Sequence, residues 1–243
     1  MVVFVIMNYA YREVIMIRGG TICKTLLKID THDIPKAASI MAQTFAKDDP
    51  LYQHILPDET TRLQVLNIFF HRYIEMLYPY SDLLTTTENY EAVALVFHSE
   101  RQAETVRSKV KYMKQIAFAI IKSLPICRIV GVRGFIRGIS ILLSMSSSWL
   151  AMLGDQEYMH LDMLVVQEQY RGQGYVSKII NPLIAECRRK NIMCSLETQT
   201  LSNLPIYEHY QFRTVKVIPL PNSSLEQYCM VYRPDGDLLG NLA

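Results

Sequence analysis

The chain has 243 residues, of which half are apolar, and a formal net charge of +2. This length allows one large domain or two small ones, and so small a net charge gives no strong attraction to nucleic acid or to anionic membranes. The five cysteines are odd in number and form no Cys-x-x-Cys pattern, and the six histidines are scattered. We therefore expect no disulfide framework and no metal site, and we predict a cytoplasmic protein.

The N-terminal residues 1–20 begin with an apolar run but lack the basic region and the cleavage site of a signal peptide. They are also too short to span a bilayer. We interpret them as an N-terminal extension whose status the sequence leaves open, with Met7 or Met16 as alternative starts. Residues 21–243 contain no internal repeat and no low-complexity tract, so a single domain is expected there.

The first third of the chain predicts helices that pack on a sheet, because periods of 3.6 and 2 alternate along it. The expected elements are a strand over 25–29, a helix from the candidate N-cap Asp33 to Phe45, a second helix over 59–78 that Pro79 ends, and a hairpin of strands over 83–87 and 92–97.

The middle of the chain, residues 99–157, is the least regular part. Its first section predicts an amphipathic helix that ends before Pro125. The apolar face of this helix carries Val106, Val110, Met113, Ala117 and Ile120, and the other face carries Arg107, Lys109, Lys111, Lys114 and Lys122. We interpret the basic face as an ordinary solvated surface, the alternative being contact with an anionic ligand or partner. The uncharged stretch 138–154 is predicted to form a helix packed over the sheet.

A glycine turn then follows a short apolar strand over 161–166 and precedes an amphipathic helix over 175–190. In this geometry the first helical amides have no partner, and the helix dipole adds partial positive charge. Gly172 and Gly174 leave no side chain between a phosphate and the backbone, and Arg171 can add a charge-assisted contact. We interpret the turn as a pyrophosphate site, with a plain tight turn as the alternative.

Two common phosphate-binding patterns fit this turn poorly. A dinucleotide fingerprint needs a third glycine where Ser177 stands, although Glu197 lies near the spacing of its acidic residue. A nucleoside-triphosphate loop needs a Gly-Lys-Ser/Thr ending, which is missing.

The motif Gln-x-x-Gly-x-Gly between a strand and a helix is followed by a strand over 193–198 and by Asn203-Leu204-Pro205-Ile206-Tyr207-Glu208. This order resembles the two acetyl-CoA-binding segments of the GNAT superfamily of N-acyltransferases, and within it puromycin N-acetyltransferase and its relatives, over about residues 28–233. One departure is Gln211, because the family usually has Gly before the residue that corresponds to Phe212. The resemblance implies an α/β fold: a central mixed, mostly antiparallel sheet flanked by helices, with an extra helical insertion over about 99–157.

The resemblance also implies a function. We expect an acyltransferase that moves an acetyl group from acetyl-CoA to a primary amine of a small molecule, such as an antibiotic or other xenobiotic, by direct attack in a ternary complex. It would act as a monomer or homodimer, without nucleic acid, membrane or metal. The alternatives are a protein or peptide N-acetyltransferase, a non-catalytic acyl-CoA sensor and a nicotinamide-dinucleotide binder.

Acetyl transfer requires a deprotonated amine, a hydrogen-bond donor for the oxyanion and a proton for the leaving thiolate. The resemblance assigns the last role to Tyr207. Glu197 is the candidate base, with Asp162 and His160 as alternatives, and an amine of low pKa would need none. The expected cofactor-binding residues are Met163, Leu164, Val165, Val166, Arg171, Gly172, Gln173, Gly174, Tyr175, Val176, Ser177, Asn203 and Tyr207.

Overall fold

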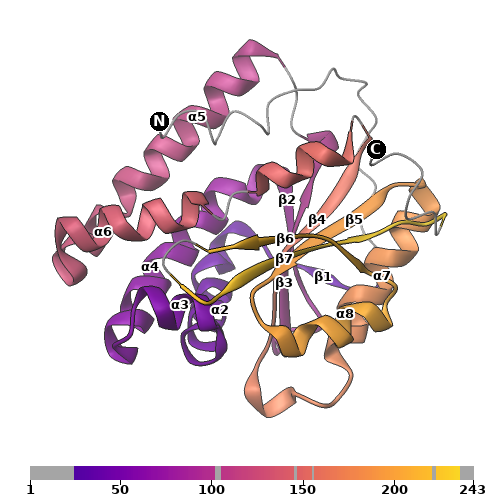
Figure 1. The fold of residues 1–243 in the computed structure, drawn as a ribbon, viewed down its shortest axis with the longest axis horizontal. Coiled ribbons are helices and arrows are strands. Elements are labelled where there is room, and N and C mark those ends of the chain that lie inside the picture. Colours follow the sequence, from indigo (N-terminus) through magenta and orange to yellow (C-terminus); the bar gives the residue numbers. More distant parts are fainter. Residues whose placement is uncertain (1–24, 102–104, 145–146, 155, 221–222, 236–243) are drawn as a thin grey trace.

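The structure is a computed structural model that describes residues 25–101, 105–144, 147–154, 156–220 and 223–235. The predicted N-terminal extension, residues 1–20, lies outside the described residues. Seven strands form one sheet in the order β1-β2-β3-β4-β5-β7-β6 (Figure 1). They are β1 (Leu27–Lys28), β2 (Ser81–Thr85), β3 (Ala92–His98), β4 (Tyr158–Val166), β5 (Met193–Thr198), β6 (Arg213–Pro219) and β7 (Glu226–Tyr232). All neighbouring strands are antiparallel except β4 and β5, which are parallel, so the predicted mixed, mostly antiparallel sheet is confirmed.

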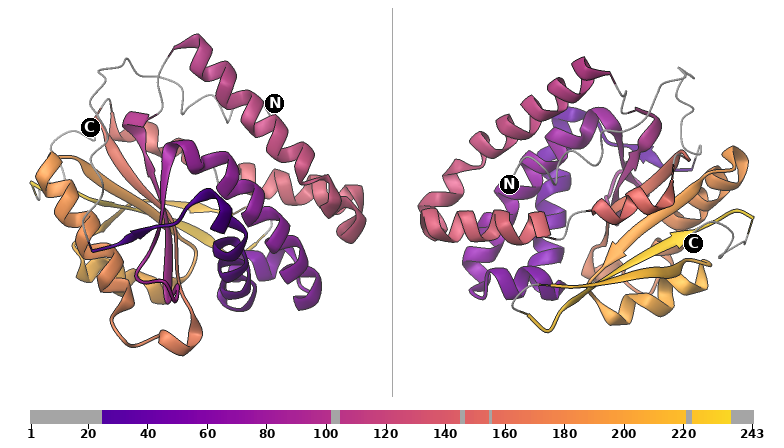
Figure 2. Two further views of the ribbon diagram at one scale, coloured as in Figure 1. Left: turned by 180° about the vertical axis from the view of Figure 1, so that it is seen from behind. Right: turned by 45° about the horizontal axis from the view of Figure 1, so that its top comes forward.

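Helices cover both faces of this sheet (Figures 1 and 2). The α-helices are α2 (Ile34–Asp48), α3 (Pro50–Ile55), α4 (Glu59–Leu77), α5 (Val106–Lys122), α6 (Cys127–Ser144), α7 (Tyr175–Lys190) and α8 (Leu204–His209). Short 3₁₀ helices join them: η2 (Thr31–Asp33), η3 (Tyr78–Tyr80), η4 (Ser99–Arg101), η5 (Leu124–Ile126), η6 (Ser147–Leu153), η7 (Glu168–Tyr170) and η8 (Leu201–Asn203).

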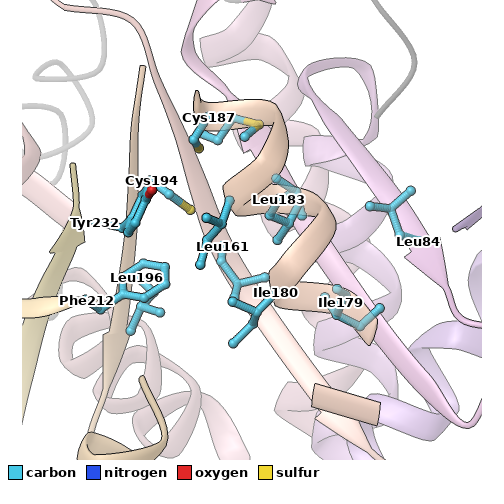
Figure 3. Packing of buried hydrophobic residues seen from close by; sticks show 14 of the residues in the cluster. Leu84, Leu161, Ile179, Ile180, Leu183, Cys187, Cys194, Leu196, Phe212 and Tyr232 are labelled. Carbon is cyan, nitrogen blue, oxygen red and sulfur yellow. The ribbon is translucent and has the colours of Figure 1, made fainter. Parts of the chain in front are cut away.

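Three apolar clusters hold these layers together. Helix α7 packs its apolar face, with Ile179, Ile180 and Leu183, on Leu161 of β4 and Leu196 of β5 (Figure 3). Helices α2 and α4 bury the second cluster against the other face of β3 and β4. The segment η6 completes the third by burying Trp149 and its neighbours beside β5 and β7. Since burial of each large apolar side chain contributes roughly 1.5–3 kcal/mol, these faces fix where the helices lie.

The insertion differs from the prediction in two ways. The helix expected over 138–154 is found in part: residues 138–144 are the end of α6, which begins earlier, at Cys127, and residues 147–153 form the 3₁₀ helix η6. Within α6, Gly131 has a φ of 72°, so the chain breaks the helical path there. Helix α5 ends before Pro125 as predicted, but Val106 and Val110 of its predicted apolar face are exposed rather than packed.

The two parallel strands separate in the middle of the sheet. Pairing between β4 and β5 runs from Tyr158 with Met193 to Leu161 with Leu196 and then stops, although both strands continue. At the same place a register shift on the β3 side gives β4 one extra residue, Asp162. A bulge of this kind bends a strand and re-aims its side chains. It turns the carboxyl end of β4 away from β5 and leaves one backbone edge unpaired.

Candidate active site

A cavity of about 600 Å³ opens where β4 and β5 separate. Its wall combines the end of β4, the glycine turn, the start of α7 and helix α8. Of the expected cofactor-binding residues, the structure brings these together around it: Leu164, Val165, Val166, Arg171, Gly172, Gly174, Tyr175, Val176, Ser177, Asn203 and Tyr207. Met163 is instead buried beside α2 and α4, and the Gln173 amide donates to the Gln169 carbonyl outside the cavity.

The glycine turn has the backbone that an anion site requires. Gly172 and Gly174 have φ values of 73° and 77°, in the left-handed region that favours glycine. No heavy atom lies within 4 Å of a Cβ built on either residue, so the space beside them is open. Gly174 is the N-cap of α7, and no side chain caps this helix. The first amides of α7 are therefore available to an anionic ligand.

Charged side chains join the end of α2 to the turn at the rim of this cavity. The Arg171 guanidinium donates to the Asp48 carboxylate and to the Val166 carbonyl. Beside it, Lys47 Nζ lies 2.6 Å from Glu168 Oε2. Arg171 is thus engaged with a carboxylate at the place where the sequence predicts a phosphate contact.

The unpaired edge of β4 presents backbone donors to the cavity. The Gln167 amide donates to the Glu91 carbonyl, at the β3 edge of the chain. Successive amides of a strand alternate between its two edges. The amides of Val166 and Leu164 therefore point to the opposite edge, where β5 has separated. This is the direction from which an oxyanion would be bound.

Three polar side chains of the cavity wall, those of Tyr207, Asn203 and Ser177, contact other residues. Burial raises the pKa of Tyr207 to about 12, and its ring packs edge-on against Phe212. The Asn203 amide donates to Thr198 Oγ1 at 3.3 Å, and although Asn203 stands at the N-cap position of α8, its side chain makes no capping hydrogen bond. Ser177 Oγ lies 2.6 Å from the Tyr210 hydroxyl.

Asp162, the extra residue of the β4 bulge, carries a buried carboxyl. Its Oδ1 accepts a hydrogen bond of 3.0 Å from the Tyr73 hydroxyl of α4, while its Oδ2 is buried without a hydrogen-bond partner in the described residues. Burial raises its pKa from 3.8 to about 7, although the Tyr73 contact opposes that shift. A carboxyl with a pKa near neutrality is suited to accept a proton at physiological pH.

The other two base candidates have different surroundings. Glu197 Oε1 accepts a hydrogen bond from Trp149 Nε1, and Glu197 does not line the cavity. His160 Nδ1 lies 2.8 Å from Ser195 Oγ, its Nε2 lies 4.0 Å from Asp162, and burial lowers its pKa to about 4. His160 is thus held neutral, and Asp162 is the carboxyl that adjoins both Tyr73 and the end of β4.

A second, apolar cavity of about 230 Å³ lies on the Tyr73 side of Asp162. Helices α3 and α4 form its floor, with Tyr52 and Phe69 among its lining residues, and α5 and α6 cover it. Burial raises the pKa of Tyr52, and the charges of Asp49 and Asp162 raise it further. The Asp49 carboxylate itself caps α3 by accepting from the amides of Leu51 and Tyr52.

Sequence reasoning did not single out Tyr52 or Tyr73 for this site. Both are aromatic residues on helices, a pattern that ordinarily indicates only packing. The signal that could have found them is the hydroxyl, because a buried tyrosine hydroxyl seeks a hydrogen-bond partner. Within the described residues no group of three or more His, Cys, Asp or Glu gathers as metal ligands would.

Comparison with known proteins places this site in a known context. Residues 129–212 match the model of the acetyltransferase (GNAT) family. This stretch contains β4, the glycine turn, α7, β5 and α8, which form most of the wall of the larger cavity.

An "uncharacterized N-acetyltransferase" of Schizosaccharomyces pombe is 34% identical over 58 residues. Those residues are 24% of this chain and 24% of the yeast protein, so the match spans about a quarter of that relative. A Corynebacterium glutamicum structure described as "histone acetyltransferase HPA2 and related acetyltransferase" covers 86% of this chain and 96% of its own, with a TM-score of 0.56 and 17% identity. This likeness shows that the two proteins share a fold.

Proposed function

We propose that the chain is an acetyltransferase of the GNAT family, whose model residues 129–212 match, and that it acetylates a primary amine of a small molecule with acetyl-CoA. One observation carries the proposal: a single cavity collects the uncapped start of α7, the free edge of β4 and Tyr207. These are the groups that bind a diphosphate, an oxyanion and a leaving thiolate, respectively. We also propose a cytoplasmic location, which the thiols of Cys127, Cys187, Cys194 and Cys229, all free, support.

The reaction follows from the groups on either side of β4. Asp162 takes a proton from the ammonium group of the acceptor, and the freed lone pair attacks the thioester carbonyl carbon. The Val166 amide donates to the developing oxyanion. As the carbon–sulfur bond breaks, Tyr207 gives its proton to the sulfur. The nitrogen then loses its second proton, which restores the Tyr207 hydroxyl, so the products are the amide and the free thiol. We prefer Asp162 to Glu197 as the base because Glu197 is held by Trp149.

The acceptor we propose is an amine with an apolar body. The apolar cavity is lined by Tyr73, the hydrogen-bond partner of Asp162, and holds about 230 Å³, more than the roughly 150 Å³ that accommodates benzene in another protein. An aromatic ring or a short aliphatic chain would fit there with its nitrogen toward Asp162. The motif resemblance to puromycin N-acetyltransferase supports an antibiotic or other xenobiotic as the physiological acceptor. A peptide acceptor is less well supported, because α5 and α6 cover this cavity.

The test is release of free thiol from acetyl-CoA with a panel of primary amines. We expect 2-phenylethylamine to react with a higher kcat/KM than a polar amine of similar pKa, such as 2-methoxyethylamine, and we would include puromycin and a peptide with a free N-terminus. The variant Tyr207→Phe should lower kcat by roughly ten- to ten-thousandfold while acetyl-CoA affinity stays similar. Tyr210→Phe, which removes another tyrosine hydroxyl that lines the same cavity, is the matched control.

Three results would contradict the proposal. Acetyl-CoA binding without thiol release for any amine would favour a sensor. Stabilisation by NAD but not by CoA would favour a dinucleotide binder, and turnover of the peptide alone would favour a peptide N-acetyltransferase.

A further inference from the structure

The helical insertion carries an unusual concentration of charge. Between Thr105 and Gly154 the sequence has eight lysines and arginines and no acidic residue. The whole chain has a net charge of +2, so this fifth of it carries +8 and the remainder carries −6. The expectation of no membrane partner came from the net charge of the whole chain, which conceals this asymmetry.

Helix α5 exposes apolar residues next to its basic ones. Val106, Val110 and Ile121 are 78%, 48% and 59% exposed, and the helical period of 3.6 places all three on one stripe. Lys111 and Lys114 are also exposed, beside that stripe. A helix of a globular protein normally turns its apolar stripe to the core, yet no residue of α5 is fully buried.

Helix α6 repeats the arrangement. Val132 and Ile136 are 63% and 60% exposed, one turn apart. Arg133 and Arg137, the next residues in the chain, are exposed as well, so a basic stripe runs beside an apolar one. We call the exposed side of α5 and α6 the insertion surface. It forms one edge of the molecule, away from β5, β6 and β7 (Figure 2).

The same segment is apolar enough for a bilayer. Of the described residues, Val106–Leu142 is the stretch that contains an 18-residue window apolar enough to cross a membrane, with a mean hydropathy of 1.6, and only 6% of that window is buried. The stretch is not one straight helix, because Pro125 separates α5 from α6 and Gly131 breaks α6. Its other side packs on α4 and covers the apolar cavity. These features suit a pair of helices lying in the membrane plane rather than a span.

We propose that the insertion surface docks the protein on an anionic membrane. Exposed valine, isoleucine and phenylalanine side chains enter the boundary between headgroups and acyl chains, while the lysines and arginines meet acidic headgroups. Charge complementarity decides among the possible occupants. A second copy of the chain would bring the same excess of positive charge to this surface, and nucleic acid would leave the apolar stripes in water. The proposal does not depend on the acetyltransferase activity.

Vesicle co-sedimentation of the full chain tests the proposal. The vesicles are neutral phosphatidylcholine or phosphatidylcholine with 30% phosphatidylserine. We expect binding to the anionic vesicles, weakening as salt rises from 0.05 to 0.3 M. Because each basic residue near the surface contributes about fivefold to binding, Lys111→Glu with Lys114→Glu should lower it at least tenfold. The matched control is Arg213→Glu with Lys216→Glu, an equal charge change on exposed residues of β6.

A second pair of variants tests the apolar contact. Val132→Ser with Ile136→Ser should also lower vesicle binding at least tenfold while leaving thermal stability unchanged, because both side chains are exposed. Thiol release with a water-soluble amine should be unchanged in all these variants.

Four outcomes would overturn the proposal. They are no binding to anionic vesicles, equal loss in the β6 control, binding that the serine variants leave unchanged, and a doubled mass in light scattering that the serine variants abolish. The third would indicate a purely electrostatic polyanion site, and the fourth a dimer interface.

Discussion

Asp162 combines burial with an incomplete set of hydrogen bonds. One carboxylate oxygen accepts from Tyr73 and the other has no partner in the described structure, and its pKa is raised to about 7. The raised pKa means that the proton stabilises the folded state. That contribution is complete below the unfolded pKa near 4 and is lost as the pH rises through 7. Ionising this carboxyl therefore lowers the free energy of unfolding. For the same reason the ionised Asp162 is a stronger proton acceptor than a solvated aspartate.

Asp162→Asn should consequently have opposite effects on activity and stability. We expect kcat to fall by roughly 10²–10⁴ and the rise of wild-type activity around pH 7 to disappear. The free energy of unfolding should increase relative to wild type, by an amount that grows between pH 4 and pH 7 to on the order of 2–4 kcal/mol. Rate profiles and denaturant melts across this range measure both. Glu197→Gln is the control, and loss of the pH 7 limb in that variant alone would transfer the role of base to Glu197.

Gln211 adopts a backbone conformation that suits glycine. Its φ is 68°, in the turn between α8 and β6, where the resembling family usually has glycine. The left-handed conformation costs a residue with a Cβ roughly 1–2 kcal/mol, of which the greater freedom of unfolded glycine cancels part.

Gln211→Gly should therefore raise the free energy of unfolding by roughly 0.5–1 kcal/mol, measured by denaturant melts. Gln211→Ala keeps a Cβ and should gain nothing. An equal gain in both variants would show that the glutamine side chain, and not its backbone, is the source of the strain.

At the scale of elements, the glycine turn and the first amides of α7 can bind an anion only if no side chain of the turn blocks the approach of the anion. Gly172→Val would place a branched side chain where a phosphate approaches the backbone, and we expect acetyl-CoA affinity to fall by more than about a hundredfold, as measured by calorimetry. Gly154 offers a matched control, because its φ of 71° and its open surroundings are the same but it lies at the end of η6. Gly154→Val should lower the free energy of unfolding as much as Gly172→Val does, but it should leave acetyl-CoA affinity unchanged. If both variants lost acetyl-CoA affinity equally, backbone strain and not the filled phosphate site would be the cause.

Elements with a strong period were predicted well. The limits of α7 and β5 are those expected, because Ile179, Leu183 and their neighbours alternate in a clear helical pattern and β5 is a short apolar run. The part of α6 before residue 138 was not predicted, because Gly131, Gly134 and Gly138 suppress helix propensity and the exposed apolar side chains of α6 give no clear period. Local pattern also cannot tell an apolar face that packs from one that stays in solvent, so Val106 and Val110 were misjudged.

At the scale of the whole molecule, most of the candidate cofactor site is continuous in sequence and could be predicted. The glycine turn, the end of β4 and Tyr207 lie within 45 residues of one another and form one wall. The acceptor side could not be predicted in the same way. It depends on the hydrogen bond between Tyr73 of α4 and Asp162 at the β4 bulge. It also depends on Trp149, which lies far from Glu197 in the sequence and donates a hydrogen bond to its carboxylate. Bulges and long-range contacts depend on tertiary packing, which no local pattern records.

The ion pairs between α2 and the turn imply an order of events in turnover. A diphosphate that reaches the turn competes with Asp48 for the guanidinium of Arg171. The displaced carboxylate sits next to Asp49, which anchors the first turn of α3 and thereby Tyr52 in the wall of the apolar cavity. Arrival of the thioester would thus release a carboxylate next to the helix that carries Tyr52. We expect a compulsory order in which acetyl-CoA binds first and the amine second.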